Sequence, residues 1–544
     1  MQEYLKQQIS EALKKIEPDR HIPEITIEKP RSPEHGDAAT NIALVLARAL
    51  KNNPRKIAEE IAAQIDTETG YIKSVEVAGP GFINFRFSGT WLTEQLMNAF
   101  RKKEQFGRSD LLQDKKIQVE FVSANPTGPL TVGHGRNAVL GDTIARVLEW
   151  AGATVQREYY FNNAGRQMRV LAESVHARYL QQIGKDAEFP EGGYEGAYII
   201  EIARKVREEH GDALIGDEHL GVFRKAAEES IFDDIKQTLL RMNISMDSFF
   251  NENTLYEDGS IDSVIALLKQ KNLIYEDEGA TWFKTTEFGK EKDTVLIKSS
   301  GEPTYRLPDI AYHINKISRG FDLAIDVFGA DHIATYPDVI SAVEACGYDS
   351  RKIDVIVYQF VTIVKDGKPF KMSTRKANFV TLDELMDEVG ADVTRFFFLM
   401  RAPGTHLEFD INEAKQAGEK NPVFYLQYAH ARIQSIMRKV RDTYDFKNTE
   451  PDFTLLVHES EISLIKRILE FPDVITSTAT HREPHKVINY LNELATAFHR
   501  FYHDCRILGE NEQLAIARTE LLTVTATVLS NGLGILGINA PDRM

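Results

Sequence analysis

Cysteines and long apolar runs are scarce in this sequence. Cys346 and Cys505 are the only cysteines among 544 residues, which excludes a disulfide framework and any four-cysteine zinc site. No stretch approaches about 18 uninterrupted apolar residues, so a membrane span is excluded. The N-terminal segment alternates charged with apolar residues and lacks the apolar core of a signal peptide. From these absences we expect a cytoplasmic protein in a reducing compartment, with no membrane partner.

An excess of positive charge is missing as well. The chain has 65 lysines and arginines against 81 aspartates and glutamates, a formal net charge of -16. This balance excludes a uniformly basic nucleic-acid coat, although a local basic patch can still bind nucleic acid. The P-loop pattern G-x-x-x-x-G-K-[ST] does not occur, so any nucleotide chemistry is of another type.

Two further patterns are weak. A G-x-G-x-x-G match from Gly532 to Gly537 ends seven residues before the C-terminus, where no strand–helix–strand unit can follow. His481 and His485 have a metal-ligand spacing, but Pro484 interrupts the helix and no third ligand is evident. We therefore expect no dinucleotide fingerprint and no protein-bound metal.

What is present divides the chain into three regions. Residues 1–110 combine helical patterns with an alternating strand and predict a small α+β domain. Residues 111–411 alternate strands with helices, which favours a doubly wound parallel sheet, and a charged, mostly helical stretch at about 165–290 is interpreted as an insertion. Residues 412–544 show helical periodicity alone. The expected strands of the sheet lie at 117–122, 153–160, 294–298, 322–328 and 354–361. The prediction is a multidomain α/β protein with a Rossmann-like core, an N-terminal α+β domain and a C-terminal all-α bundle.

The most informative segment, residues 119–136, reads VEFVSANPTGPLTVGHGR. It starts in a strand and ends at a helix N-terminus, whose free N–H groups and positive dipole end suit a phosphate. Gly133 allows close approach to the backbone, and His134 can donate to a phosphate oxygen. The alternative is an ordinary strand-to-helix loop with a capping histidine, and the residues alone leave both open.

A second segment, residues 365–376, reads KDGKPFKMSTRK and follows another predicted strand. A basic, glycine-containing loop can neutralise charge on a polyphosphate; alone, it could equally be a solvated turn. Ligands of open α/β sheets bind at the carboxyl ends of the strands. Two phosphate-seeking loops at that edge therefore indicate an ATP site.

These residues resemble the signatures of class I aminoacyl-tRNA synthetases, and specifically of the arginyl-tRNA synthetase family. The run TVGH at 131–134 is similar to the HIGH signature, and KMSTR at 371–375 is similar to KMSKS. The resemblance covers nearly the whole chain. Its further matches lie, in order, at 36–41, 79–85, 304–313, 329–332, 421–432 and 541–544.

The resemblance implies ATP-dependent ligation of L-arginine to its tRNA through an arginyl-adenylate, with release of pyrophosphate and AMP. It implies tRNA, L-arginine and ATP as partners, Mg²⁺ held mostly by phosphates and water, no structural metal, and a monomer. No covalent enzyme intermediate is implied, so positioning and electrostatics carry the catalysis. The alternative is a catalytically silent, synthetase-like tRNA-binding protein.

The resemblance also assigns roles to residues of the nucleotide site. The expected catalytic residues are Thr131, His134, Lys371, Ser373 and Lys376. The expected ATP-binding residues are Gly133, His134, Gly329, Asp331, Lys371 and Met372.

Four residues are expected to bind arginine. Carboxylates in fork geometry recognise a guanidinium best, and the resemblance places them at Glu120 and Asp309. Tyr305 is expected to line the pocket and Asn125 to hold the α-amino end. A strand-end salt bridge for Glu120 and a helix first-turn acid for Asp309 are the alternatives.

Contacts to tRNA are expected on both flanking domains, with residues 1–110 reading the outer corner of the tRNA and residues 412–544 binding the anticodon. An exposed aromatic beside an amide suits an unpaired base. The expected tRNA-binding residues are Phe82, Asn84, Gln427, Arg432, Tyr502 and Met544.

Two positions depart from the signatures. Thr131 replaces the first histidine of HIGH, and Thr374 replaces the second lysine of KMSKS. A threonine hydroxyl can bond a phosphate but carries no positive charge, so another cation must compensate. The candidates, left open here, are Arg375, Lys376, Lys115 and Lys116.

Overall fold

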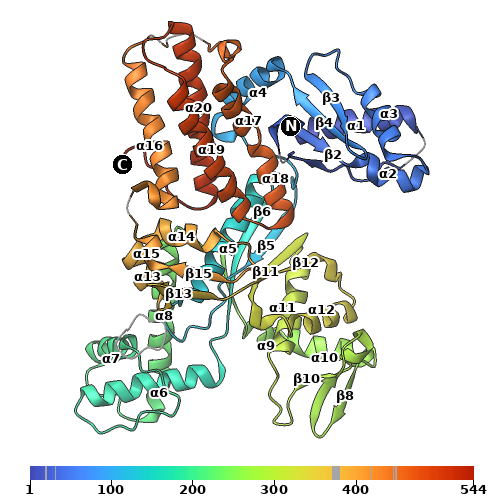
Figure 1. Cartoon of the computed structure of the whole chain (residues 1–544). Helices are drawn as coiled ribbons and strands as arrows, with labels where there is room; N and C mark the ends of the chain where they lie inside the picture. Colours follow the sequence, from blue (N-terminus) through green and yellow to red (C-terminus); the bar gives the residue numbers. More distant parts are fainter. Residues whose placement is uncertain (19–20, 31, 371–379, 417, 445, 447–449) are drawn as a thin grey trace.

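A five-stranded parallel sheet forms the centre of the computed structural model, which describes residues 1–18, 21–30, 32–370, 380–416, 418–444, 446 and 450–544 (Figure 1). Its strands run in the order β12-β11-β5-β6-β7, and each neighbouring pair is parallel. The strands are β5 (Lys116–Glu120), β6 (Thr154–Phe161), β7 (Ser248–Asn251), β11 (Leu323–Gly329) and β12 (Ile353–Tyr358). The predicted doubly wound core is thus confirmed.

Helix α5 (Val132–Trp150) follows β5 and is buried along most of its length. The apolar side chains of its inner face, among them Val139, Leu140 and Ile144, are all at most 2 % exposed. Gly141 lies so close to the Phe121 ring that a Cβ there would meet it at 2.2 Å. This glycine therefore allows the helix to pack directly on the end of β5.

Two sequence expectations within this core were wrong. The predicted strand at 294–298 is β10 (Thr294–Ile297), which belongs to a separate antiparallel sheet with β8 (Ile274–Asp277) and β9 (Ala280–Phe283). Conversely, β7 lies inside the stretch interpreted as one insertion, yet it pairs with β6 in the main sheet. With only four residues, β7 is too short to reveal a periodicity.

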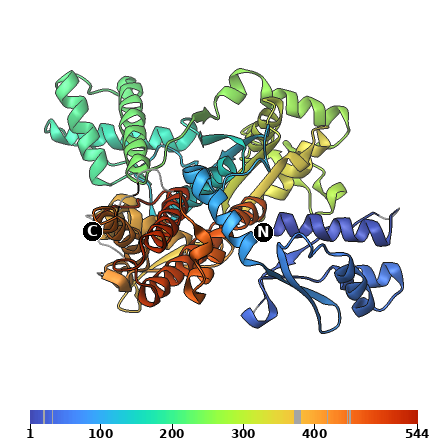
Figure 2. The same cartoon turned by 90° about the horizontal axis from the view of Figure 1, so that it is seen from above.

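The stretch at 165–290 therefore consists of two units flanking β7, which extend away from the core on different sides (Figure 2). The first contains α6 (Gly165–Gln182), α7 (Ala197–His210) and α8 (Leu220–Arg241). The second contains α9 (Thr254–Glu257), α10 (Ser260–Gln270), β8 and β9, and the chain continues from it through β10 into α11 (Arg306–Ser318).

The N-terminal domain is an antiparallel sheet in the order β1-β2-β4-β3 covered by helices, as predicted. The helical segment at 42–64 is two helices, because Asn53 caps the second one and Pro54 occupies its first position. The elements are α1 (Gln2–Ile16), β1 (Ile27–Glu28), β2 (Ala38–Thr40), α2 (Ile42–Leu50), α3 (Pro54–Gln64), β3 (Ile72–Ala78), β4 (Phe82–Phe87) and α4 (Gly89–Lys102).

The chain returns from the core to a C-terminal bundle, which stacks on α5 through α18 and α20 (Figure 1). The connecting elements are α12 (Tyr336–Ala345), β13 (Val361–Lys365), β14 (Lys368–Pro369), α13 (Leu382–Val389), α14 (Ala391–Leu399), β15 (Leu407–Asp410) and α15 (Ile411–Ala414). The bundle helices are α16 (Pro422–Arg441), α17 (Glu459–Leu469), α18 (Phe471–His481), α19 (His485–Asp504) and α20 (Glu512–Ile535). None of the described helices is long and apolar enough to cross a membrane.

The weak patterns of the C-terminal region have structural explanations. Gly532 and Gly534 lie within α20, and Gly537 follows its end with a φ of +71°. His481 ends α18 and His485 begins α19. Among the described residues, no cluster of His, Cys, Asp and Glu has the arrangement of a metal site.

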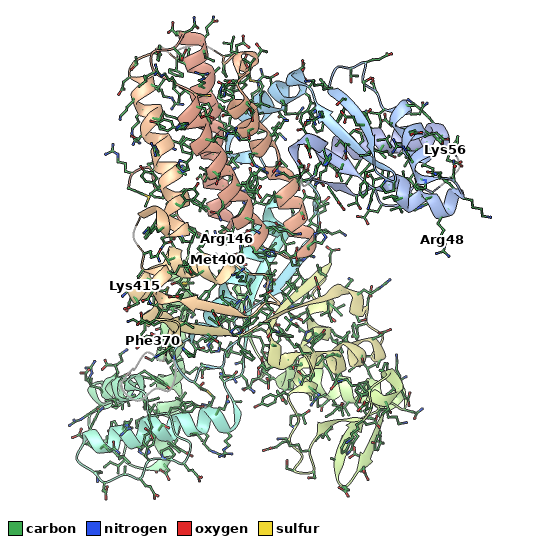
Figure 3. All side chains as sticks on the ribbon, viewed as in Figure 1. Arg48, Lys56, Arg146, Phe370, Met400 and Lys415 are labelled. Carbon is green, nitrogen blue, oxygen red and sulfur yellow. The ribbon has the colours of Figure 1, made fainter. Side chains whose placement is uncertain are left out.

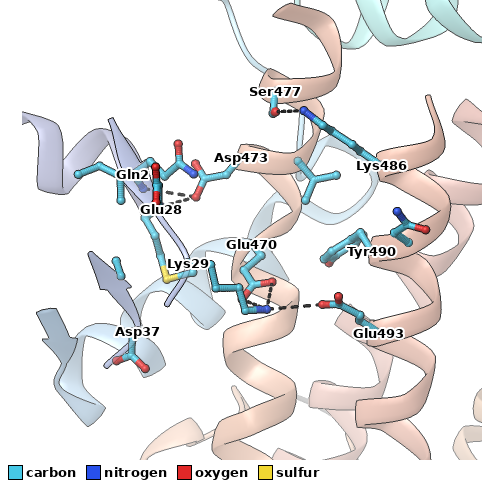
Figure 4. Close-up of a pocket in the computed structure, with 15 residues that line it drawn as sticks. Gln2, Glu28, Lys29, Asp37, Glu470, Asp473, Ser477, Lys486, Tyr490 and Glu493 are labelled. Atoms are coloured by element: carbon cyan, nitrogen blue, oxygen red, sulfur yellow. Dashed lines mark hydrogen bonds and ion pairs between the residues drawn. The ribbon is translucent and has the colours of Figure 1, made fainter. Parts of the chain in front are cut away.

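A pocket separates the N-terminal domain from the bundle (Figure 4). Ion pairs cross it: Lys29 Nζ lies 3.3 Å from Glu470 and 3.5 Å from Glu493. The backbone N–H of Gln2 donates to Asp473 at 3.3 Å. Charged groups thus hold the two domains together around this pocket.

Candidate active site

The carboxyl ends of the parallel strands gather polar side chains at one edge of the sheet. Glu120 ends β5, Asn162 directly follows β6, and Glu252 directly follows β7. Asp309, in the first turn of α11, interacts electrostatically with Glu120 and Glu252. Open α/β sheets bind their ligands at this edge, so the arrangement marks it as the candidate site.

The helix that begins at this edge presents His134 in a defined state. The His134 Nδ1 lies 3.1 Å from the backbone N of Thr131, which can only donate, so Nδ1 is the acceptor. Burial lowers the pKa of His134, which favours the neutral ring with its proton on Nε2. Thr131, the N-cap of α5, thereby fixes His134 as a neutral donor.

The loop between β5 and α5 contains a strained turn that sequence analysis missed. Val122 and Ser123 have φ values of +67° and +46°, and a β-branched residue rarely adopts this conformation. Asn137 of α5 secures the turn: its Oδ1 accepts from the Val122 N–H at 2.7 Å, and its Nδ2 donates to the Val327 carbonyl at 2.8 Å. One amide therefore joins α5, the loop and β11.

The predicted ATP-binding residues fall into three groups. Gly133 and Gly329 lie at the ends of neighbouring elements, and the Tyr358 hydroxyl at the end of β12 lies 3.5 Å from the Gly133 carbonyl oxygen. Asp331 follows β11 in an exposed turn, 3.8 Å from His332. The remaining predictions, Lys371, Met372, Ser373 and Lys376, lie outside the described residues, as do Thr374 and Arg375.

Two of the candidate compensating cations are excluded by topology. Lys116 is the first residue of β5, and Lys115 precedes it and pairs with Asp322 at 3.5 Å. A five-residue strand spans roughly 16 Å, and the site lies at the opposite end of β5. Neither lysine can therefore replace the missing positive charge at the nucleotide.

Glu120 is 4 % exposed and already has a cationic partner. The Lys316 ammonium of α11 lies 2.5 Å from its Oε2, and the Ser123 hydroxyl donates to its Oε1 at 2.8 Å. The strand-end salt bridge, given above as the alternative for Glu120, is therefore present. Of the two carboxylates predicted to bind arginine, Asp309 is the one that forms no such salt bridge within the described part of the chain.

Asp309 is half-buried, and burial raises its pKa to about 7. The neighbouring charges of Glu120 and Glu252 raise the pKa further, whereas His313 and Lys316 lower it. Among the described residues, no lysine, arginine or histidine side chain forms an ion pair with Asp309. A half-buried carboxylate in this state gains most from a cationic ligand.

The other two residues predicted to bind arginine differ in their surroundings. Asn125 Oδ1 accepts from the Asn162 backbone N–H at 3.0 Å, and its Nδ2 donates to Gln167 at 2.9 Å, so its amide is held at the edge of the sheet. Tyr305 precedes α11, one turn from Asp309, but its side chain is 78 % exposed and does not line a closed pocket.

Glu252 and its partners are functional candidates that sequence analysis missed. Glu252 is 7 % exposed, and it accepts hydrogen bonds from the Tyr160 hydroxyl and the Asn162 amide, both at 2.7 Å. The Tyr160 ring packs on Tyr312 with centroids 4.5 Å apart. The available signal was an acidic residue shortly after the apolar pair Phe249 and Phe250, but their strand, β7, was not recognised.

The predicted tRNA contacts of the N-terminal domain lie on β4. Phe82 is 37 % exposed, whereas Asn84 is buried. Arg48 and Lys56 project from the outer edge of the same domain (Figure 3). This domain therefore presents an aromatic ring together with cationic side chains.

In the bundle, the predicted contacts separate into a buried and an exposed set. Gln427 is 6 % exposed and donates to Asp392 and to the Asn539 carbonyl, which is a structural role. The Arg432 guanidinium lies over the Tyr502 ring at 4.7 Å, and Tyr502 is 37 % exposed. Met544 is 63 % exposed. Arg432, Tyr502 and Met544 thus remain available to a ligand.

Comparisons with known proteins cover all three regions. Family models match as "Arginyl tRNA synthetase N terminal domain" at 3–87, "tRNA synthetases class I (R), catalytic domain" at 95–397 and "DALR anticodon binding domain" at 426–544. The chain is 53% identical over 562 residues to an arginine–tRNA ligase of Salinibacter ruber, with 100% of both chains covered. It is 50% identical to the corresponding enzyme of Desulfotalea psychrophila, covering 97% of this chain and 96% of the relative.

Solved structures agree on the fold. The arginyl-tRNA synthetase of Thermus thermophilus superposes with a TM-score of 0.79 at 23% identity, and 100% of each chain is covered. That of Plasmodium falciparum superposes with a TM-score of 0.76 at 18% identity, covering 100% of this chain and 99% of the other. Together with the full-length relatives, these matches show that the chain belongs to the arginyl-tRNA synthetase family of class I aminoacyl-tRNA synthetases.

Proposed function

We propose that this protein ligates L-arginine to its tRNA in two steps. The carboxylate of arginine attacks the α-phosphorus of ATP, which forms arginyl-adenylate and releases pyrophosphate. The terminal ribose hydroxyl of the tRNA then attacks the adenylate carbonyl and releases AMP. The main support is one observation: the N-terminus of α5 and Asp309, a half-buried carboxylate, lie at the same edge of the sheet.

Each side of the edge has a distinct task in this proposal. The free N–H groups of α5 and the Nε2–H of His134 donate to the phosphates, and Gly133 and Gly329 let the nucleotide lie against the backbone. The Lys371 loop neutralises the polyphosphate. Mg²⁺ enters with ATP, and phosphate oxygens and water are its ligands.

On the arginine side, Asp309 receives the guanidinium, and the Asn125 amide holds the α-amino end. Glu120 shapes this pocket from behind, through its pairing with Lys316. The exposed Tyr305 would have to turn inward to close the pocket over the substrate.

The flanking domains supply the tRNA surface in this proposal. Residues 1–110 bind the outer corner of the tRNA, 111–411 carry the chemistry, and 412–544 bind the anticodon. Phe82, Arg432 and Tyr502 offer rings and a cation for stacking on unpaired bases. We further propose that the protein acts as a cytoplasmic monomer.

The deciding experiment is arginine-dependent exchange of pyrophosphate into ATP, measured with and without arginine tRNA. We expect exchange with tRNA present, and we expect Asp309→Asn to lower kcat/KM for arginine about 100-fold or more, because the guanidinium loses its charged partner. Asp322→Asn, at the opposite end of the sheet, is the matched control and keeps full exchange. Absence of exchange in the unmodified protein, with tRNA still bound, would favour the silent tRNA-binding protein.

A further inference from the structure

His313 of α11 is enclosed by hydrogen-bond acceptors. The residue is 4 % exposed, its Nδ1 lies 2.6 Å from the Asp309 carbonyl oxygen, and its Nε2 lies 2.8 Å from Asp326 Oδ2. A carbonyl oxygen cannot donate, so Nδ1 carries a hydrogen. Asp326 also accepts from Lys316, as an ionised carboxylate does, so Nε2 carries a hydrogen as well. Both nitrogens donate, and the ring is therefore an imidazolium.

The charges around His313 come from three elements. Glu120 of β5 and Asp326 of β11 are neighbours in register, and Lys316 of α11 pairs with both. His313 adds a second cation to this buried group. Glu120 and Asp326 are thus balanced by two cations of α11.

The acids at the mouth of the site have no such balance. Glu252, beyond β7, accepts from neutral groups, the Tyr160 hydroxyl and the Asn162 amide. Asp309 forms no ion pair with any described residue. His313 stands directly behind Asp309, bonded to its main chain one helical turn back. Asp309 and Glu252 are therefore free to bind a cationic ligand, while the cations His313 and Lys316 lie behind Asp309.

We propose that His313 is a positioning residue of arginine recognition, whose imidazolium anchors the first turn of α11 and favours the ionised form of the Asp309 carboxylate, which binds the guanidinium. The inference rests on the proposed function, because it takes arginine as the ligand. His313 does not contact arginine in this proposal, but it controls how tightly arginine binds.

The proposal predicts a particular pH dependence. The guanidinium binds ionised Asp309, so a protonated Asp309 must lose its proton before arginine binds, and affinity rises with pH through the pKa of Asp309 at about 7. His313 is the strongest of the charges that lower this pKa. Replacing it with a neutral side chain therefore moves the transition to higher pH.

The test is calorimetric titration of L-arginine into the full-length protein from pH 5.5 to 9. We expect His313→Gln to move the midpoint upward by about one pH unit, so that arginine binds about fivefold more weakly at pH 7 and about tenfold more weakly at pH 5.5. The loss disappears near pH 9, and kcat at saturating arginine is unchanged. His210→Gln, on the surface of α7, is the matched control and behaves like the unmodified protein. A loss that is equal at every pH, or one confined to kcat, contradicts the proposal.

A second measurement does not depend on any variant. In the unmodified protein, the ¹⁵N shifts of the His313 ring at pH 7.5 should show two protonated nitrogens, whereas a neutral tautomer would overturn the proposal. The His313 resonances are assigned as those that are absent from the spectrum of His313→Gln. If that variant does not fold, selective labelling provides the assignment. Failure of the unmodified protein to bind arginine at any pH would refute the proposed function instead.

Discussion

Asn137 shows at the scale of one residue how the nucleotide loop is held in place. Its amide satisfies the Val122 N–H and the Val327 carbonyl, and Val122 sits in a strained backbone conformation. Asn137→Ala leaves both groups buried without partners, so we expect the protein to lose about 1–3 kcal/mol of stability. The displaced loop should also raise KM for ATP in pyrophosphate exchange.

Asn137→Asp provides the graded comparison for this prediction. Its carboxylate still accepts from Val122 but cannot donate to the Val327 carbonyl, so thermal unfolding and KM should fall between those of the unmodified protein and the alanine variant. Equal KM values for ATP in all three proteins would show that Asn137 does not position the loop.

Single residues also mark how far sequence could lead. The resemblance assigned Glu120, Asn125 and Asp309 to one arginine site, and the structure brings them to one edge of the sheet, where the parallel strands have their carboxyl ends. The pairing of Glu120 with Lys316 could not be predicted, since the residues lie 196 positions apart and a lysine in a helical pattern is normally solvated. The contacts of the loop at 371–379 lie outside the described residues.

At the scale of elements, cationic side chains on and directly after helix α11 neutralise the buried carboxylates of the central strands. Asp326, Glu120 and Glu158 stand in register on β11, β5 and β6. Three buried carboxylates in a row are too costly without cations. Lys316 of α11 pairs with the first two, and Arg319, just past the helix, forms two bonds of 2.6 Å to Glu158.

Lys316→Met tests this role. It leaves Glu120 and Asp326 without their ammonium group, and we expect a loss of about 3–5 kcal/mol at pH 8. The loss should shrink at pH 5, because the folded-state pKa values of the two acids rise once the cation is gone and a bound proton then replaces it. Thermal unfolding at both pH values measures the effect, with Lys269→Met on the exposed face of α10 as control. Unchanged stability at pH 8 would contradict the role of Lys316 in neutralising Glu120 and Asp326.

The same elements explain the errors in the predicted sheet. The sequence of β10 is a short apolar run like that of a buried core strand, and only its antiparallel pairing with β9 places it in the small sheet. The four residues of β7 join the core because they pair with β6 from Glu158 to Phe161. Strand pairing is a long-range property, and local periodicity does not contain it.

At the scale of the whole molecule, buried charges join the core to the bundle. Arg395 of α14 is enclosed, and its guanidinium reaches Asp142 of α5 at 2.7 Å and the Leu536 carbonyl at the end of α20 at 2.7 Å. Arg146 of α5 adds a bond of 3.3 Å to the Gly534 carbonyl (Figure 3). The helix that begins at the nucleotide site is thereby fixed directly to the bundle.

The N-terminal domain is attached by a more exposed contact, which predicts a separable effect on tRNA binding. Asp37 Oδ1 lies 2.5 Å from Lys466 Nζ of α17, beside the pocket of Figure 4, and its Oδ2 accepts from the Phe87 N–H at 2.8 Å. Removing the pair in Asp37→Asn and Lys466→Met should loosen the domain, with a coupling energy of about 0.5–2 kcal/mol in a double-mutant cycle followed by hydrogen exchange of β2.

Because this contact lies far from the sheet edge, arginine affinity in the same variants should stay unchanged while KM for tRNA rises several-fold. Aminoacylation with varied tRNA, together with calorimetric arginine binding, separates the two effects. Lys6→Ala, whose partner Glu3 lies within the same helix at 3.1 Å, removes a surface pair of that domain and is the control for docking. If KM for tRNA does not change when the domain loosens, the orientation of the N-terminal domain does not contribute to tRNA binding.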